Sequence, residues 1–280
     1  MNIGSAIITA KNILEKNFSK SPDLDSEILM SKTIEKDRKY LMLNLEKNLG
    51  KDKLNYFTNL VVERLAGKPI AYITNRKDFW KYEFEVRKDS LIPRPDTELL
   101  IEQALNITKN KSNLRVLDIG VGSGCILLSI LKEKKNFYGT GIDISKKCIT
   151  LSKINASRLQ LIARVKFFNS DVDNFNIGKY DLIISNPPYI KKLELRYLDR
   201  DIINFEPKLA LDGGLDGLSV IRKVINKSSE LIKKDGKFIL EIGFDQKNKV
   251  KKLLKNKGFY INKVLKDLAK NDRCIVSTKI

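Results

Sequence analysis

The sequence predicts an α/β protein with a largely parallel sheet and a small helical domain before it. Two observations lead to this prediction. From about residue 114 onward, short apolar runs alternate with amphipathic stretches, the pattern of a parallel sheet covered on both faces. Residues 1–73 instead carry apolar residues at three-to-four spacing. We expect a helical domain at 1–73, a hairpin-like linker at 74–93 and an α/β domain at 94–280.

The first 93 residues contain clear signals for helix ends and for a pair of strands. Ser21 before Pro22 is a helix-start signal, and a later helix is expected to stop at Gly67, with Pro69 just beyond. The stretch KDFWKYEFEVRKDSLI alternates apolar and polar residues, as two short strands would. PRPDTELL then reads as a proline-stiffened entrance to a further helix.

The α/β region supplies the remaining elements. We expect strands at LRVLDIG, FYGTGID, VKFFNSD, YDLIIS and KFILEIG. Helices are expected at GCILLSILKEK, SKKCITLSKINASRLQ (capped by Ser145), GLSVIRKVINKSSELIKKDG and DQKNKVKKLLKNKG. YINKVLKD and RCIVSTKI are separated by a short link, so they predict an antiparallel hairpin at the edge of the sheet.

Composition excludes several kinds of chemistry. The chain of 280 residues has no histidine, which rules out an imidazole base, a Ser–His–Asp triad and histidine metal ligands. The three cysteines are far apart and form no CxxC pair, so we expect neither a zinc site nor a disulfide framework, and no metal. No apolar run approaches the roughly 20 residues that span a bilayer. The N-terminus lacks the features of a signal peptide, so a cytoplasmic location without membrane contact is expected.

The net charge favours a negatively charged partner. There are 53 basic and 34 acidic residues, a net charge of +19. Such a field favours polyanions such as ribosomal RNA, tRNA or DNA. The lysines are nevertheless spread along the whole chain, as on an ordinary solvated surface, and are densest in IKKDGK and KNKVKKLLKNKG.

A glycine-rich turn joins the first strand of the α/β region to its helix. Its spacing is GxGxG rather than the GxGxxG of dinucleotide-binding proteins. The glycines allow a tight turn and close approach of a ligand, and a carboxylate before the first of them suits a ligand with an ammonium group. The candidate ligand-binding residues are Asp118, Gly120, Val121, Gly122, Ser123 and Gly124.

Two further acidic residues follow neighbouring strands. Asp143 ends FYGTGID, 23 residues after Gly120, where a carboxylate accepts hydrogen bonds from ribose hydroxyls. After the next strand, Asp171 is placed to reach an adenine amino group and Val172 to line the adenine face. These residues indicate an adenosine-bearing ligand, and at this point NAD and S-adenosylmethionine are both open.

The tetrapeptide Asn186–Pro187–Pro188–Tyr189 follows the strand YDLIIS and faces the same crevice, because the carboxyl ends of parallel strands meet at one edge. The prolines fix φ, and the residue before a proline is extended. The Asn186 Oδ1 and the Pro187 carbonyl are then two rigid acceptors that match the two hydrogens of a planar NH2 group. Tyr189 offers a flat face for stacking.

These motifs together resemble the release factor glutamine methyltransferase family. The likeness is carried by GKPIAYITNRKDFW, LIPRPDTELL, LDIGVGSG, SNPPYI and FEPKLALDGGLDGL, which occur in the family's order. The resemblance implies a Rossmann-like class I methyltransferase sheet, S-adenosylmethionine as cofactor, and class I peptide-chain release factors as partners. The implied reaction is methylation of the glutamine amide in their Gly-Gly-Gln motif. The helical segment would recognise the substrate.

The resemblance also implies roles for residues of the site. Asn186, Pro187 and Tyr189 would be catalytic, with Pro188 beside them, and Asn186 would also contact the cofactor. Arg94 and Glu98 are expected to shape the cofactor or peptide pocket, the alternative being a rigid elbow capped by Asp96 or Thr97. Glu206 is expected to contact substrate or to brace its loop. The sequence departs from the family at Val172, where members often carry an aromatic residue.

Three alternatives remain open. An adenine-N6 nucleic-acid methyltransferase would use the same tetrapeptide on a base amine and would suit the positive charge. Against it, no separate target-recognition domain is evident. A ribosomal-protein glutamine methyltransferase is disfavoured by PRPDTE. A non-enzymatic RNA-binding protein on the same scaffold is disfavoured by the intact glycine turn, Asp143 and Asn186.

Overall fold

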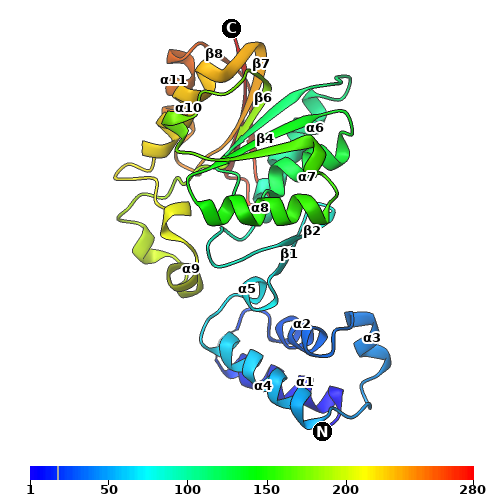
Figure 1. Ribbon diagram of the computed structural model, residues 1–280. Coiled ribbons are helices and arrows are strands. Elements are labelled where there is room, and N and C mark those ends of the chain that lie inside the picture. Colours follow the sequence, from blue (N-terminus) through cyan, green and yellow to red (C-terminus); the bar gives the residue numbers. More distant parts are fainter. Residues whose placement is uncertain (18) are drawn as a thin grey trace. The chain divides into compact units, whose positions relative to one another are not determined.

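The computed structural model of the chain describes residues 1–17 and 19–280 (Figure 1). The chain divides into two compact units. The smaller comprises Met1–Arg76 together with Arg200–Phe205, and the larger comprises Lys77–Asp199 together with Glu206–Ile280. Residues 77–93, set apart as a linker in the sequence analysis, are therefore counted with the larger unit.

The smaller unit is helical. Its helices are α1 (Ile3–Lys16), α2 (Pro22–Ile34), α3 (Arg38–Leu43), α4 (Lys51–Leu65), α5 (Ile70–Thr74) and the later segment α9 (Arg200–Phe205). One face of each long helix supplies the core, which includes Ile3, Leu14, Leu29, Met30 and Phe57. Arg64 lies between Asp25, at 2.8 Å, and Asp201, at 3.0 Å, and so ties α9 to α2 and α4.

The larger unit contains two sheets within the described residues. The small one is the hairpin of β1 (Arg76–Phe79), whose first residue belongs to the smaller unit, and β2 (Tyr82–Glu85). The large one has seven strands in the order β5-β4-β3-β6-β7-β9-β8. Its strands are β3 (Arg115–Ile119), β4 (Tyr138–Asp143), β5 (Val165–Asn169), β6 (Tyr180–Ser185), β7 (Ile232–Glu241), β8 (Phe259–Lys266) and β9 (Asp272–Lys279). β3 to β7 pair in parallel, whereas β9 is antiparallel to both of its neighbours.

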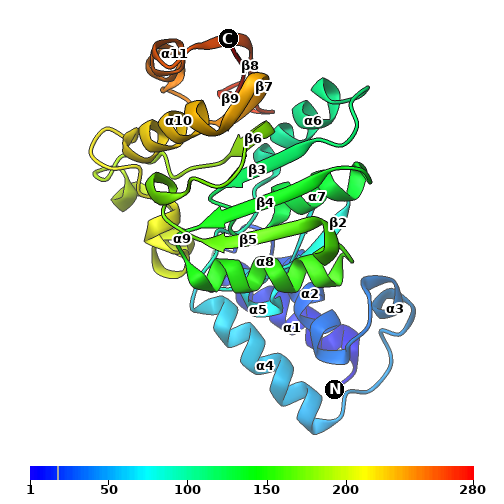
Figure 2. The same cartoon turned by 45° about the horizontal axis from the view of Figure 1, so that its top comes forward.

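Helices cover both faces of this sheet (Figure 2). They are α6 (Glu98–Ile107), α7 (Cys125–Glu133), α8 (Lys146–Arg158), α10 (Ser219–Leu231) and α11 (Lys247–Asn256). Alternate residues of each strand enter two separate cores. Val116 packs with α6 and α7, while Leu117 packs with α10 and α11. Among residues 1–17 and 19–280, no helix has the length and apolar character that a membrane crossing requires.

The predicted α/β fold is confirmed, with one correction in its second half. The sequence predicted a helix continuing through IKKDG, but α10 ends at Leu231 and Ile232 already pairs with Tyr180 of β6. The register then jumps, because Leu182 pairs with Lys237 and the residues between bulge outward, with Asp235 at φ 61°. The polar residues of IKKDG resemble the end of a helix in the sequence, but the pairing of this segment with β6 determines its conformation. The predicted hairpin is present, and its second strand, β9, lies between β7 and the edge strand β8.

Candidate active site

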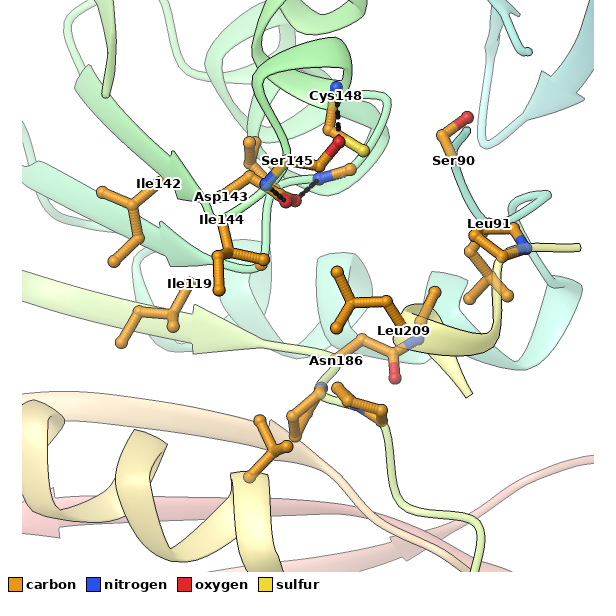
Figure 3. Close-up of a pocket in the computed structure, with 18 of the residues that line it drawn as sticks. Ser90, Leu91, Ile119, Ile142, Asp143, Ile144, Ser145, Cys148, Asn186 and Leu209 are labelled. Carbon is orange, nitrogen blue, oxygen red and sulfur yellow. Dashed lines mark hydrogen bonds between the residues drawn. The ribbon is translucent and has the colours of Figure 1, made fainter. Parts of the chain in front are cut away.

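A cavity of about 440 Å³ lies at the carboxyl ends of β3, β4 and β6 in the larger unit. The glycine turn and the residues after β4 form one side of it, and the segments 89–94 and 207–210 contribute another. Figure 3 shows Asp143, Ile144 and Ser145 on one side, Ser90 and Leu91 on another, and Asn186 with Leu209 between them. The volume suits a small ligand such as a nucleoside.

The glycine turn lines the cavity through Gly120, Val121, Gly122 and Ser123. Gly120 and Gly124 have φ of 80° and 84°, a region that residues with a Cβ rarely adopt. A Cβ at Gly120 would meet nothing within 4 Å, so the turn leaves open space there. A Cβ at Gly124 would lie 2.9 Å from the Leu128 side chain, so this glycine serves packing against α7 and does not line the cavity.

Asp143 lies at the end of β4 and is held by backbone donors. Its Oδ2 accepts from the Gly122 N–H at 2.9 Å and its Oδ1 from the Ser145 N–H at 2.8 Å (Figure 3). Ser145 in turn caps α8, since its hydroxyl oxygen accepts from the Cys148 N–H at 3.3 Å. Burial raises the pKa of Asp143, and the two N–H donors oppose that shift. Each carboxylate oxygen keeps a lone pair for a ligand hydroxyl.

Asp118 is buried behind the turn and does not line the cavity. Neither of its carboxyl oxygens has a hydrogen-bond partner among the described residues. Burial raises its pKa to about 7, and the nearby Asp143 adds to the shift, while the Leu127 backbone N–H, which does not reach hydrogen-bond geometry, opposes it. A buried carboxylate without a partner is costly, so this position favours a cationic group nearby.

Asp171 and Val172 lie after β5 and both line the cavity. Asp171 precedes the short helix η3 (Val172–Asn174), and its Oδ1 accepts from the Asp173 N–H at 2.8 Å. Val172 is half-buried and, with Ile144 and Ile142, gives this end of the cavity apolar side chains.

Asn186, Pro187 and Pro188 line the cavity directly after β6. β6 is fixed to β3 at this point, because the Ser185 hydroxyl donates to the Ile119 carbonyl at 2.7 Å. The Asn186 Nδ2 donates to the Thr97 Oγ1 at 3.1 Å. Its Oδ1 makes no hydrogen bond within the described part of the chain.

Tyr189, by contrast, is not among the residues that line the cavity. Its hydroxyl donates to the Glu241 Oε1 at 3.2 Å and accepts from the Arg273 Nη1 at 3.2 Å. Burial, followed by the charge of Glu241, raises its pKa above the usual range. Stacking of a substrate amide on this ring stays a prediction.

Arg94 and Glu206, both expected near the substrate, are brought together. The Arg94 guanidinium forms an ion pair with Glu206, whose other oxygen accepts from the Ile92 N–H at 3.3 Å. Arg94 lines the cavity, whereas Glu206 is buried and does not. The pair joins two segments that line the cavity, and substrate contact by either residue stays a prediction.

The sequence does not lead us to expect Thr97, Glu241 or Arg273 at the site. Thr97 ends the short helix η1 (Pro95–Thr97), and its hydroxyl donates to the Glu241 Oε2 at 2.8 Å rather than capping α6. Glu241 is the last residue of β7, next to β6. An acidic residue at the carboxyl end of a strand is the signal that could have drawn attention to it.

Two family models match the chain. The methyltransferase small domain matches residues 95–215, and the PrmC N-terminal domain matches residues 5–74. A release factor glutamine methyltransferase of Clostridium acetobutylicum is 37% identical over 282 residues, covering 100% of this chain and 99% of the relative. A bifunctional methyltransferase of Rickettsia conorii is 34% identical over 304 residues, covering 100% of this chain, which spans 58% of that relative's length.

Solved structures show the same fold. A methyltransferase from Pyrococcus furiosus aligns with a TM-score of 0.55 and 17% identity, covering 79% of this chain and 98% of that one. This likeness supports the class I methyltransferase arrangement of the larger unit.

Proposed function

The chain belongs to the release factor glutamine methyltransferase family, and we propose that it methylates the glutamine side-chain amide of the Gly-Gly-Gln motif in class I peptide-chain release factors, with S-adenosylmethionine as methyl donor. The observation that carries this proposal is the Asn186 side chain. Its NH2 group donates a hydrogen bond to Thr97, and its Oδ1, beside the cavity, accepts none from residues 1–17 and 19–280. A fixed acceptor of this kind suits a substrate NH2 group.

The residues of the cavity fit S-adenosylmethionine. Asp143 has spare lone pairs for the ribose hydroxyls, and Gly120 leaves room for close approach. Asp118 does not line the cavity, and its buried carboxyl, which has no hydrogen-bond partner among the described residues, would favour the ammonium group through its charge. Asp171 and Val172, which do line the cavity, would meet the adenine. When bound, this cofactor supplies an electrophilic methyl group on a sulfonium.

The chain's own residues would bind and orient the amide. An amide nitrogen is a poor nucleophile because its lone pair is delocalised. The Asn186 Oδ1 and the Pro187 carbonyl would accept its two hydrogens and stabilise the positive charge that develops on the nitrogen. The prolines keep these acceptors rigid, so the correct orientation of the amide would supply much of the rate enhancement. The chain has no histidine to act as a base, and the proton can leave after transfer.

The helical unit and the surface charge complete the proposal. The match of residues 5–74 to the PrmC N-terminal domain supports a role for this unit in recognising the release factor. A partner in translation would place the enzyme in the cytoplasm. The net charge of +19 would favour contact with ribosomal RNA or another polyanion near that partner.

Transfer of tritiated methyl groups tests the proposal directly. Purified class I release factor should be labelled, and the same factor with its Gly-Gly-Gln glutamine replaced by alanine should not. DNA and RNA serve as competing acceptors in parallel reactions. Labelling of nucleic acid instead of release factor would favour the adenine-N6 activity and overturn the proposal.

A further inference from the structure

A continuous network of hydrogen bonds lies behind the Asn186 side chain. The Asn186 Nδ2 donates to the Thr97 Oγ1 at 3.1 Å, and the Thr97 hydroxyl donates to the Glu241 Oε2 at 2.8 Å. From the other side, Arg273 donates to the Tyr189 hydroxyl, which donates to the Glu241 Oε1 at 3.2 Å. Thr97 and Glu241 are each 2% exposed, so water does not substitute for these bonds. We call Thr97 and Glu241 the relay.

When Glu241 is ionised, chemistry fixes the direction of every bond in this network. A carboxylate only accepts hydrogen bonds, and a hydroxyl has a single proton to donate. The proton of Thr97 is therefore committed to Glu241. The Thr97 oxygen faces Asn186 with lone pairs only, so the NH2 end of the Asn186 amide must turn toward it.

The reversed amide would be unfavourable on both sides. Rotation by 180° would place the Asn186 oxygen about where its nitrogen now lies, against the lone pairs of the Thr97 oxygen. A buried hydrogen bond would be lost, and two acceptors would face each other. The NH2 group would also replace the oxygen beside the cavity, where it would oppose the hydrogens of a substrate amide.

We propose that Thr97 and Glu241 are positioning residues that set the orientation of the Asn186 amide, so that its oxygen faces the substrate NH2 group. The catalytic consequence rests on the proposed function, whereas the orientation itself does not. Neither residue touches the substrate amide in this proposal, because both act through Asn186. PRPDTE therefore contributes to the acceptor site through its threonine.

The surroundings of Glu241 add a dependence on pH. Burial raises its pKa to about 7. The hydrogen bond from Thr97, the charge of Arg273 from β9 and the hydrogen bond from Tyr189 oppose this shift, and the charge of Asp96 from η1 adds to it. Tyr189 and Cys274 are the other titratable groups beside it, and both keep their protons because their own pKa values are raised. The Thr97 hydroxyl is forced to donate to Glu241 only when Glu241 is charged. We therefore expect kcat to rise with pH as Glu241 loses its proton, around pH 7.

A set of variants separates positioning from general structural support. We expect Thr97→Val to lower kcat about tenfold, with the cofactor Kd and the KM for release factor within about twofold, since one hydrogen bond is worth roughly that factor. Thr97→Ser keeps the hydroxyl and should restore both kcat and its rise with pH. Thr108→Val makes the same change at a threonine that is also 2% exposed but lies outside the site, and should leave kcat unchanged.

The decisive comparison is the double variant. If Thr97 acts only through Asn186, then Thr97→Val combined with Asn186→Ala should have the kcat of Asn186→Ala alone. Losses that multiply would overturn the proposal, as would wild-type kcat in Thr97→Val. A wild-type enzyme that failed to label release factor would contradict the proposed function instead.

A measurement without substrate tests the orientation independently. In protein labelled with ¹⁵N-asparagine, the NH2 signal of Asn186 is assigned by its loss in Asn186→Ala. Its protons should exchange slowly with solvent in wild type and Thr97→Ser, and at least about tenfold faster in Thr97→Val. Equal exchange in all three proteins would show that the relay does not hold the amide.

Discussion

The two halves of the cavity are built in different ways. Around the glycine turn, Asp143 is held by backbone N–H groups only 21 and 2 residues away. Around Asn186, the partner Thr97 is 89 residues away, and the partner of Thr97 is another 144 residues along the chain. The first half depends on backbone that the strand–turn–helix unit supplies. The second depends on single side chains from distant segments, so it is more sensitive to substitution.

The largest expected effect comes from removing the Asn186 Oδ1, the hydrogen-bond acceptor in the second half of the cavity. Asn186→Ala should lower kcat about 10²- to 10³-fold, the usual consequence of losing one preorganised polar group at the reacting centre. The cofactor Kd, measured by calorimetry, should stay within about threefold because the glycine turn is untouched. Asn262→Ala, on the exposed part of β8, is the matched control. Wild-type kcat in Asn186→Ala would remove the proposed distinction between the two halves.

The complementary change in the first half is Asp118→Asn. It removes the buried negative charge that suits the ammonium group of the cofactor. The cofactor Kd should rise about 10- to 100-fold, because opposite charges a few ångströms apart attract by a few kcal/mol at an effective dielectric constant of about 20. At saturating cofactor, kcat should change little. An unchanged Kd would mean that Asp118 only packs beneath the turn.

Asp118 also gives the free enzyme a pH dependence of its own. Its pKa is raised from 3.8 to about 7 by burial, so between these values the folded chain binds more protons than the unfolded chain. Its contribution to stability is therefore complete below the unfolded value and is lost as pH rises toward the folded one. Relative to wild type, Asp118→Asn should gain Tm between pH 5 and pH 8, on the order of 5 °C. If plots of Tm against pH, measured without cofactor, were parallel for wild type and Asp118→Asn, this prediction would be wrong.

The same contrast explains how much the sequence could predict. The glycine turn, Asp143 and the Ser145 cap of α8 follow from short contiguous patterns, and the structure brings them together. The contact of Thr97 with Glu241 joins segments 144 residues apart, and no local pattern announces it. The end of α10 was predicted wrongly for a related reason, since pairing with β6 overrides the helical preference of the local sequence.

A smaller effect is expected at the ion pair between Arg94 and Glu206. Arg94→Ala leaves the buried Glu206 carboxylate without its cation, which should lower the free energy of unfolding by about 1–3 kcal/mol given that Arg94 is partly exposed. Denaturant unfolding measures this loss. Adding Glu206→Gln removes the uncompensated charge and should recover part of it. If the double variant were less stable than Arg94→Ala, the pair would not brace this part of the cavity as described.

The smallest effect is expected at Val172, where the first half departs from the residue type that the family often carries. Val172 is half-buried beside Asp171 at the apolar end of the cavity, and an aromatic ring there could stack on adenine. Val172→Phe should therefore tighten the cofactor Kd about three- to tenfold, the range that aromatic pairs contribute beyond simple burial. Val172→Leu adds apolar volume without a ring and is the matched control. Equal tightening by both variants would assign the gain to burial rather than stacking, and weaker binding by Val172→Phe would show that the cavity is already filled. Because kcat depends on the other half, it should be the same in all three proteins at saturating cofactor.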